Sequence, residues 1–449
     1  MTNLTRSLGS YVAALKIEDI PVQAREIAKV GVADAYGVMI AGAREPAVAF
    51  VHEQMPWADR VEQATIALGG SQADLQHAAL VNGMAAHVLD YDDVALDGHP
   101  SAVLMPAVLA QAEALGADGG KMLAAYIAGY EVWAELQARE PGHLHEIGLH
   151  PTAIYGAVAA AAACASLRRL DPDQAAMAIA LAASLSSGLV ANFGTMTKSF
   201  QVGRAAQSGI IAAQLAQAGM TASLDALEHG SGFLHAFSPT RQADRDGVFS
   251  AGVDRPLRIL EQGLNIKRYP VCYGAHRAID GVLALDPRGD LVGQVDSIEV
   301  EIGEVQMAML RNHKPRSALE AKFSLEFSVA SALIFHHVGL AQLKDEIVQR
   351  PDLQTLMQRV RYTTTKALGT GLPFSPADTV VIHTQDGRRL VGEPVASAKG
   401  SHANPLSQDE LAAKFRDCMA SKRPGPEADA LFMRLMALEC VGSVAELWR

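Results

Sequence analysis

The densest group of residues that could do chemistry lies in the first quarter of the chain. His87 is followed by Asp90 and the pair Asp92 and Asp93, and His99 stands a few residues later in a Gly-His-Pro-Ser run. Three carboxylates within four positions repel one another on a helix, so an ordinary surface helix would not favour them. A histidine near carboxylates can move a proton, because an ordinary imidazole titrates near pH 6.5. The pattern fits an acid–base site, or equally a solvated loop whose aspartates cap helices.

Further histidines precede a second predicted helix. His143 and His145 are followed by His150, which stands before a proline and an alanine-rich run. The tight helical HExxH spacing of a zinc site is missing, so no metal is predicted, and a capping or surface role stays open for these residues. His150 is the most interesting, because a helix N-terminus helps to hold an anion. The acidic stretch also fits a calcium loop poorly, since Val94 occupies the third ligand position.

Cations that could hold an anion occur in two separate places. Lys198 lies among small residues where a helix is expected to begin, and Arg204 follows it. Lys267 lies near an apparent domain junction, with His276 nine residues after it. Either lysine could anchor a carboxylate. The alternatives are a solvated lysine at position 198 and a basic linker at 267.

Composition narrows the function. The chain has 449 residues, of which 49% are hydrophobic and 19% charged, with a net charge of −11. This balance is opposite to that of most nucleic-acid binders, and we expect neither a nucleic acid nor a membrane as partner. Four scattered cysteines without a CxxC motif favour neither an iron–sulfur cluster nor a disulfide scaffold. The sequence contains no P-loop, dinucleotide fingerprint or GxSxG elbow, so we expect no organic cofactor. Without a signal-like N-terminus, a cytoplasmic location is expected.

Periodicity predicts a helical region followed by a mixed one. The expected helices span 22–40, 102–116, 121–138, 152–169, 175–187, 204–219, 274–285, 324–338, 411–419 and 427–437. Alternating or β-branched segments predict strands at 297–302, 359–365, 379–384 and 388–391, the last two joined by an Asp-Gly turn. The predicted fold class is mainly α with a smaller α+β domain. We expect residues 1–263 and 400–449 to form the helical domain and 264–399 an inserted α+β lid.

Five motifs in order resemble the MmgE/PrpD family and span most of the chain. They are HVLDYDD with GHPS at 87–101, His150 with its proline, GTMTKSFQVGRAA at 194–206, KRYPVCYGAH at 267–276 and EAKFSLEF at 320–327. The family includes 2-methylcitrate dehydratase, cis-aconitate decarboxylase and iminodisuccinate epimerase. The resemblance implies a homodimer without metal or organic cofactor and a site between the two domains. It also implies a small di- or tricarboxylate substrate.

The resemblance also implies roles for individual residues. Matching positions suggest His99, Asp90 and His150 as catalytic residues, and four residues as substrate-binding: Lys198, Lys267, Arg204 and His276.

Two departures bear on the reaction. The resemblance implies that decarboxylases of the family carry hydroxyl side chains at two positions where this chain has Val94 and Phe327. These departures make cis-aconitate decarboxylation a less favoured prediction and do not select among the other activities. The favoured prediction is a hydro-lyase similar to 2-methylcitrate dehydratase. An epimerase or isomerase of an amino- or imino-dicarboxylate is the alternative. A decarboxylase comes third, and a non-catalytic carboxylate-binding protein is the alternative from another class.

Overall fold

The fold is mainly helical, with a small mixed sheet, as predicted. The computed structural model describes residues 3–55, 62–250, 255–369 and 374–449. The chain divides into two compact units, one of residues 1–264 with 409–449 and one of residues 265–408.

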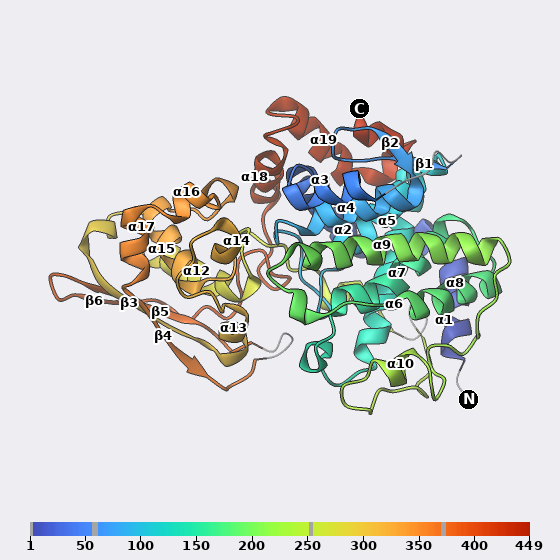
Figure 1. Ribbon diagram of the computed structural model, residues 1–449, viewed down its shortest axis with the longest axis horizontal. Coiled ribbons are helices and arrows are strands. Elements are labelled where there is room, and N and C mark those ends of the chain that lie inside the picture. The colour runs from blue at the N-terminus through green and yellow to red at the C-terminus, as the bar shows by residue number, and fades with distance from the viewer. Residues whose placement is uncertain (1–2, 56–61, 251–254, 370–373) are drawn as a thin grey trace. The chain divides into compact units, whose positions relative to one another are not determined.

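The first unit is built from helices contributed by both ends of the chain (Figure 1). Its helices are α1 (Leu4–Ala14), α2 (Val22–Gly42), α3 (Pro46–Gln54), α4 (Leu75–His87), α5 (Pro100–Ala114), α6 (Gly119–Ala138), α7 (Pro151–Leu167), α8 (Pro172–Leu185), α9 (Met196–Gln217), α10 (Phe233–Ala236), α11 (Arg258–Gln262), α18 (Gln408–Met419) and α19 (Pro426–Met436). A short antiparallel pair, β1 (Gln63–Thr65) and β2 (Gln72–Asp74), precedes α4.

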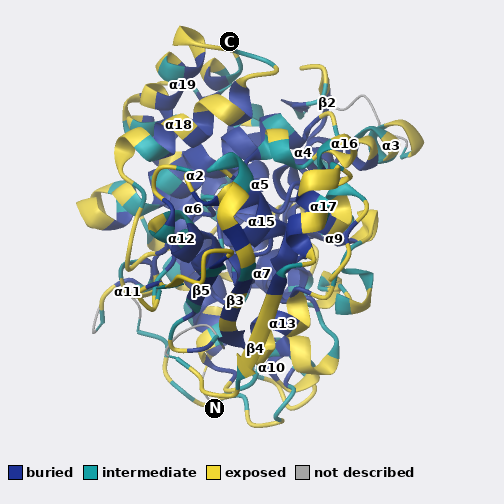
Figure 2. Cartoon of the chain, turned by 90° about the vertical axis from the view of Figure 1, so that its left-hand side faces the viewer, coloured by how far each residue is buried: buried dark blue, intermediate teal, exposed yellow. Residues whose placement is uncertain are grey.

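Small residues let the central helices of this unit approach closely. A Cβ on Gly203 of α9 would lie 2.2 Å from the carbonyl oxygen of Leu80 on α4, and a Cβ on Gly83 would lie 2.9 Å from Cα of Gly203. Helices α5 and α7 are buried along almost their whole length, as the dark blue ribbons of Figure 2 show. The close packing fixes α4 against α9, and these two helices carry residues of the candidate site.

The second unit is a four-stranded sheet with helices packed on it (Figure 1). Its strands are β3 (Val295–Gly303), β4 (Val360–Thr365), β5 (Thr379–Thr384) and β6 (Arg389–Val391), in the order β4-β3-β5-β6. Its helices are α12 (His276–Leu285), α13 (Glu304–Met309), α14 (Ala318–Ala321), α15 (Leu325–Phe335), α16 (Asp345–Val348) and α17 (Pro351–Met357). Strand β3 is parallel to β4 and antiparallel to β5, with Ile298 opposite Val360 and Ile382. Edge strand β4 is mostly exposed (Figure 2).

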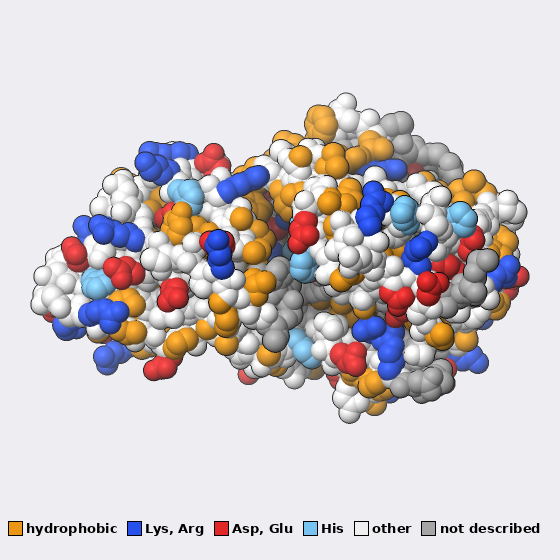
Figure 3. All heavy atoms as spheres, turned by 90° about the horizontal axis from the view of Figure 1, so that it is seen from below, with side chains coloured by type: hydrophobic (Ala, Val, Ile, Leu, Met, Phe, Trp, Pro, Cys, Tyr) orange, Lys and Arg blue, Asp and Glu red, His pale blue; other side chains and the backbone are white. Residues whose placement is uncertain are grey.

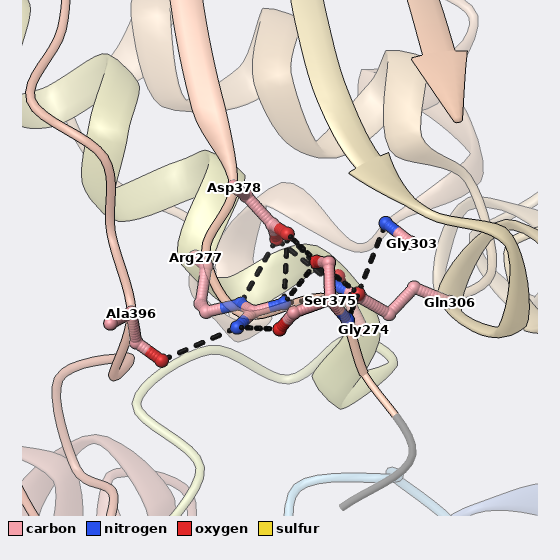
Figure 4. Close-up of polar contacts among 7 residues, drawn as sticks. All are labelled: Gly274, Arg277, Gly303, Gln306, Ser375, Asp378 and Ala396. Atoms are coloured by element: carbon pink, nitrogen blue, oxygen red, sulfur yellow. Dashed lines mark hydrogen bonds and ion pairs between the residues drawn. The ribbon is translucent and has the colours of Figure 1, made fainter. Parts of the chain in front are cut away.

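A buried polar cluster ties α12 to the strands of the second unit (Figure 4). The Arg277 guanidinium donates to both carboxylate oxygens of Asp378, at 3.1 and 2.8 Å, and to the hydroxyl of Ser375 at 2.7 Å. Gln306 donates to Asp378 at 2.9 Å and accepts from Ser375. A buried charge pair is tolerated when its remaining hydrogen-bonding groups are satisfied, as they are here. The cluster is structural and joins distant parts of the unit.

Most predicted elements are confirmed, and the differences have local causes. The Asp171 cap of α8 forms a full capping box with Gln174. The hairpin turn is confirmed, with Gly387 at φ +88° between β5 and β6. Helix 204–219 was predicted too short, because α9 begins at Met196 behind the Thr195 cap. Helix 324–338 ends at Phe335, because His336 adopts the left-handed conformation.

The surface carries charges of both signs. On the face that Figure 3 shows, Lys and Arg side chains are interspersed with Asp and Glu. Among the described residues, none of the helices combines the length and the apolar character that crossing a membrane requires.

Candidate active site

The candidate site is organised by the loop between α4 and α5, residues 88–99. Asp90, Leu96 and Asp97 have positive φ angles of 54°, 53° and 60°. Such conformations are uncommon outside glycine, although aspartate tolerates them better than most residues, and they cluster at functional sites. A backbone bridge between Ala95 and Gly98 closes the loop. The loop is therefore held in one specific shape rather than lying loosely between two helices.

The acidic residues of this loop are buried. The exposed fractions are 5% for Asp90 and 0% for both Asp92 and Asp93. The interpretation of the stretch as a solvated loop is therefore wrong. Burying carboxylates is unfavourable unless they are paired or protonated, so each must have its own partner.

Asp92 is paired with two histidines. Its Oδ2 lies 2.8 Å from Nδ1 of His87 and 3.0 Å from Nδ1 of His99. Nδ1 of His99 also lies 2.8 Å from the backbone oxygen of Asp93. A carboxylate and a carbonyl only accept hydrogen bonds, so we assign the proton of both imidazoles to Nδ1. Each ring then presents its Nε2 as an acceptor or base.

The two neighbouring aspartates have pKa values that are shifted in opposite directions. Burial acts to raise the pKa of Asp92, but the two histidines outweigh it and the pKa lies below the ordinary value. Burial, together with the charge of Asp92, raises the pKa of Asp93 well above the ordinary value. Asp93 bonds to the backbone N–H and the hydroxyl of Ser101, at 3.2 and 2.8 Å. Asp92 is therefore the charged partner of the histidines, and Asp93 holds the start of α5.

His150 lies at the N-terminus of α7, as predicted, and bonds to α9. Its Nδ1 lies 3.1 Å from Oε1 of Gln201. The amide of Gln201 is oriented by Leu189, whose N–H donates to Oε1 at 2.8 Å and whose carbonyl accepts from Nε2. Oε1 is thus an acceptor, and His150 carries its proton on Nδ1. Burial lowers the pKa of His150 well below the ordinary value, so the ring is neutral. Gly188 makes room, since a Cβ there would lie 2.6 Å from Oε1 of Gln201.

The rings of three histidines are close together. The ring centroids of His87 and His99 lie 4.6 Å apart, and those of His87 and His150 lie 6.3 Å apart. Lys198, in the first turn of α9, forms an ion pair with Asp90 and lies 5.3 Å from the ring centroid of Phe193. The structure thus brings together Asp90, His99, His150 and Lys198. The solvated alternative for Lys198 is wrong, since only 9% of the residue is exposed.

The remaining predicted residues belong to the second unit or have other partners. Arg204 is half-buried, and its guanidinium donates to Gln207 on the same helix. Lys267 and His276 belong to the second unit, where both are buried. Nε2 of His276 faces the backbone oxygen of Val271 at 3.3 Å. A role for Lys267 and His276 in binding stays a prediction.

One group in the described residues has the composition of a metal site. Ligand atoms of His87, Asp92 and His99 lie within 4.8 Å of one another. The Nδ1 atoms that face Asp92 are the protonated ones, and a metal would have to displace both protons. Two hydrogen bonds through these Nδ1 atoms join the three side chains.

Sequence reasoning missed the importance of two groups. Asp92, rather than Asp90, contacts His99, and Gln201 orients His150. Gln201 lies three positions after Lys198, on the same side of α9, and this helical spacing was the available signal. The sequence carried only a weak signal that Asp92, and not Asp90, contacts His99, because both aspartates lie in one short acidic run.

Comparison with known families agrees with the motifs. Models of the MmgE/PrpD N-terminal and C-terminal domains match residues 6–246 and 269–434. The chain belongs to the MmgE/PrpD family. It is 27% identical to mouse cis-aconitate decarboxylase over 363 residues, covering 76% of this chain and 71% of the relative. It is 26% identical to the human enzyme over 366 residues, or 76% and 72% of the two chains. For cis-aconitate decarboxylase of Aspergillus terreus the identity is 25% over 455 residues, or 94% and 90%.

Proposed function

We propose that this chain is an enzyme that moves a proton next to a carboxylate of a small di- or tricarboxylate. The reaction we favour is the dehydration of a hydroxylated substrate, similar to that of 2-methylcitrate dehydratase. The observation that carries the proposal is the pairing of His99 with buried Asp92 at 3.0 Å. The pairing holds Nδ1 and leaves Nε2 as the base. The side chain of His99 is 16% exposed, whereas that of His87 is fully buried.

The residues of the first unit suffice for the proton transfer. Nε2 of His99 would take the Cα proton, and Asp92 would stabilise the resulting imidazolium. The imidazolium would then give that proton to the departing β-hydroxyl, so that the C–O bond breaks, the carbon–carbon double bond forms and water leaves. Negative charge would develop on the substrate carboxylate, where a lysine can stabilise it. Lys198 is the candidate in this unit and Lys267 in the second. Neutral His150 would accept a hydrogen bond or act as a second base rather than bind a carboxylate by charge.

The alternative function is epimerisation of an amino- or imino-dicarboxylate. His99 and His150 each present an Nε2, and an epimerase needs one group that removes a proton and another, in its protonated form, that delivers one to the opposite face of the same carbon. Decarboxylation comes third, although it is the activity in the names of the relatives. At about a quarter identity, the relatives leave the reaction open, and Val94 and Phe327 replace the expected hydroxyls. Both the favoured function and the alternative need no metal or organic cofactor.

A panel of carboxylates in deuterated water separates these activities. We expect a hydroxylated di- or tricarboxylate to yield new ultraviolet absorbance from a carbon–carbon double bond. Deuterium incorporation without absorbance would instead favour epimerisation, and release of carbon dioxide would favour decarboxylation. Binding without any of the three would indicate a carboxylate-binding protein and would overturn the proposal.

A further inference from the structure

His87 has an acceptor atom that the proton-transfer scheme does not use. Its Nε2 is buried and has no hydrogen-bond partner among the residues the structure describes. The other ring nitrogen, Nδ1, donates to Asp92 at 2.8 Å. The proton is therefore on Nδ1, and Nε2 is left with a lone pair. Burial also lowers the pKa of His87 to about 4, which keeps the ring neutral at physiological pH.

The ring that carries the unpaired acceptor lies close to two other histidines of the site. The ring of His87 lies edge-on to that of His99 and near that of His150. A second acceptor, Oδ1 of Asp92, is also buried without a partner among the described residues. Buried acceptors are unfavourable when they lack a donor, and most in native proteins have one. Nε2 of His87 and Oδ1 of Asp92 are two such acceptors, and they belong to side chains that are hydrogen-bonded to each other inside a candidate site. They point to a ligand that supplies an N–H or O–H donor.

We infer that the substrate carries a hydroxyl or amino donor and that His87 selects it by accepting that hydrogen bond on Nε2. The inference rests on the proposed function and narrows its substrate class. A hydroxylated or amino-bearing di- or tricarboxylate satisfies the acceptor. An unsaturated tricarboxylate without such a donor leaves Nε2 and Oδ1 of Asp92 buried and unpaired. His87 is thus a specificity-determining residue that favours hydroxylated substrates over the substrate in the names of the relatives.

Matched ligand pairs test the selection directly. Citrate and tricarballylate differ by one hydroxyl, as do malate and succinate, so each pair isolates the donor. Binding is measured by calorimetry on the full-length wild type and on His87→Asn. Asparagine can place an amide N–H where Nδ1–H of His87 lies and keep the bond to Asp92, but it has no acceptor at the Nε2 position. His52→Asn is the matched control, because His52 pairs with His77 rather than with Asp92.

We expect the wild type and His52→Asn to bind the hydroxylated member of at least one pair about tenfold or more tightly. In His87→Asn that ratio should fall to near one, while the affinity for tricarballylate or succinate is retained. Equal affinities within both pairs in the wild type would overturn the inference and leave the proposed function intact. That result is expected if a water molecule, rather than the ligand, donates the hydrogen bond to Nε2. A ratio that survives His87→Asn would overturn it as well. If the wild type binds none of the four, the proposed function fails together with the inference.

Discussion

Oδ2 of Asp92 lies 3.0 Å from Nδ1 of His99, and the same oxygen accepts a hydrogen bond from His87. This relationship fixes the tautomer of His99 and the direction of its Nε2. It also provides a buried negative charge to stabilise the imidazolium that forms during proton transfer. Asp92 is fully buried, and its two histidine partners lower its pKa, whereas burial raises the pKa of the neighbouring Asp93.

Replacing Asp92 with Asn should therefore lower kcat. The amide keeps the size of the carboxylate, but it can present an N–H to one of the two histidines and so favour the wrong tautomer. We expect kcat to fall by about 10²-fold or more, with a smaller change in KM. Steady-state kinetics on the substrate found in the carboxylate panel measures this effect. Near-normal turnover in Asp92→Asn would contradict the role given to the pair.

Substitutions of His99 and the lysines should separate catalysis from binding. His99→Asn should reduce kcat by about 10²- to 10⁴-fold while leaving KM largely unchanged. Lys198→Ala and Lys267→Ala should mainly raise KM, because each leaves a substrate carboxylate without its counter-charge. Lys198→Ala also leaves Asp90 without its ion pair, so Lys198→Ala with Asp90→Asn is the control. If His99→Asn retained turnover, Asp90 or His150 would inherit the proton transfer.

The sequence predicted the fold class and most helices because their signals are local. Alternation in 297–302 lies within β3, and the Asp-Gly turn gave the β5–β6 hairpin. Helix α4 was not predicted, because it is apolar nearly all round and has no single hydrophobic face. The short strands β1 and β2 were missed too, since three residues are too few for a periodic signal.

The sequence singled out several residues that the structure places near one another, but it did not predict their pairings. Asp90 and His99 lie in one loop, whereas His150 and Lys198 come from two other segments, and the structure brings the four together in the first unit. Which aspartate contacts His99 depends on the left-handed backbone at Asp90, and a residue pattern does not encode that turn. Binding by Lys267 stays a prediction.

Exhaustive chelation should leave activity unchanged. The His87, Asp92 and His99 ligand atoms are already joined through two protonated Nδ1 atoms, and uptake of a metal would cost both hydrogen bonds. Activity after dialysis against a chelator, with metal content measured in parallel, checks this expectation. A stoichiometric metal whose removal abolishes turnover, and whose return restores it, would contradict it.

Stability should fall on the acid side of neutrality. The pKa values of His87, at about 4, and of His150 lie below the ordinary value of 6.5. Below pH 6.5 the unfolded chain therefore binds more protons than the folded one at these positions. Each histidine then lowers the free energy of unfolding by up to about 1.4 kcal/mol per pH unit. His143, whose pKa is raised beside Asp97, acts in the opposite direction.

Urea unfolding between pH 8 and 5 measures how steeply the free energy of unfolding changes with pH. His87→Asn should reduce this slope by the contribution of about one proton. An unchanged slope in that variant would argue against a buried neutral His87.

The C-terminal segment supports the 88–99 loop through one buried lysine. Nζ of Lys414, on α18, forms an ion pair with Asp34 on α2 at 2.5 Å and donates to the backbone oxygen of Tyr91 at 2.9 Å. The same nitrogen lies 4.0 Å from the centroid of the Tyr91 ring. Tyr91 stands between Asp90 and Asp92 in the chain. Lys414 thus joins two helices to the part of the loop that carries the acidic residues.

Lys414→Met should destabilise the protein and lower kcat. The substitution removes the buried ion pair between Lys414 and Asp34, and breaking such a pair typically costs about 3–5 kcal/mol. Adding Asp34→Asn removes the stranded charge, so the double variant should regain most of the stability measured by urea unfolding. Because the contact to the Tyr91 carbonyl is still missing, the double variant should keep a reduced kcat. Lys414→Arg retains the charge and donors and should restore part of kcat. A double variant with both normal stability and normal kcat would show that Lys414 does not position the loop.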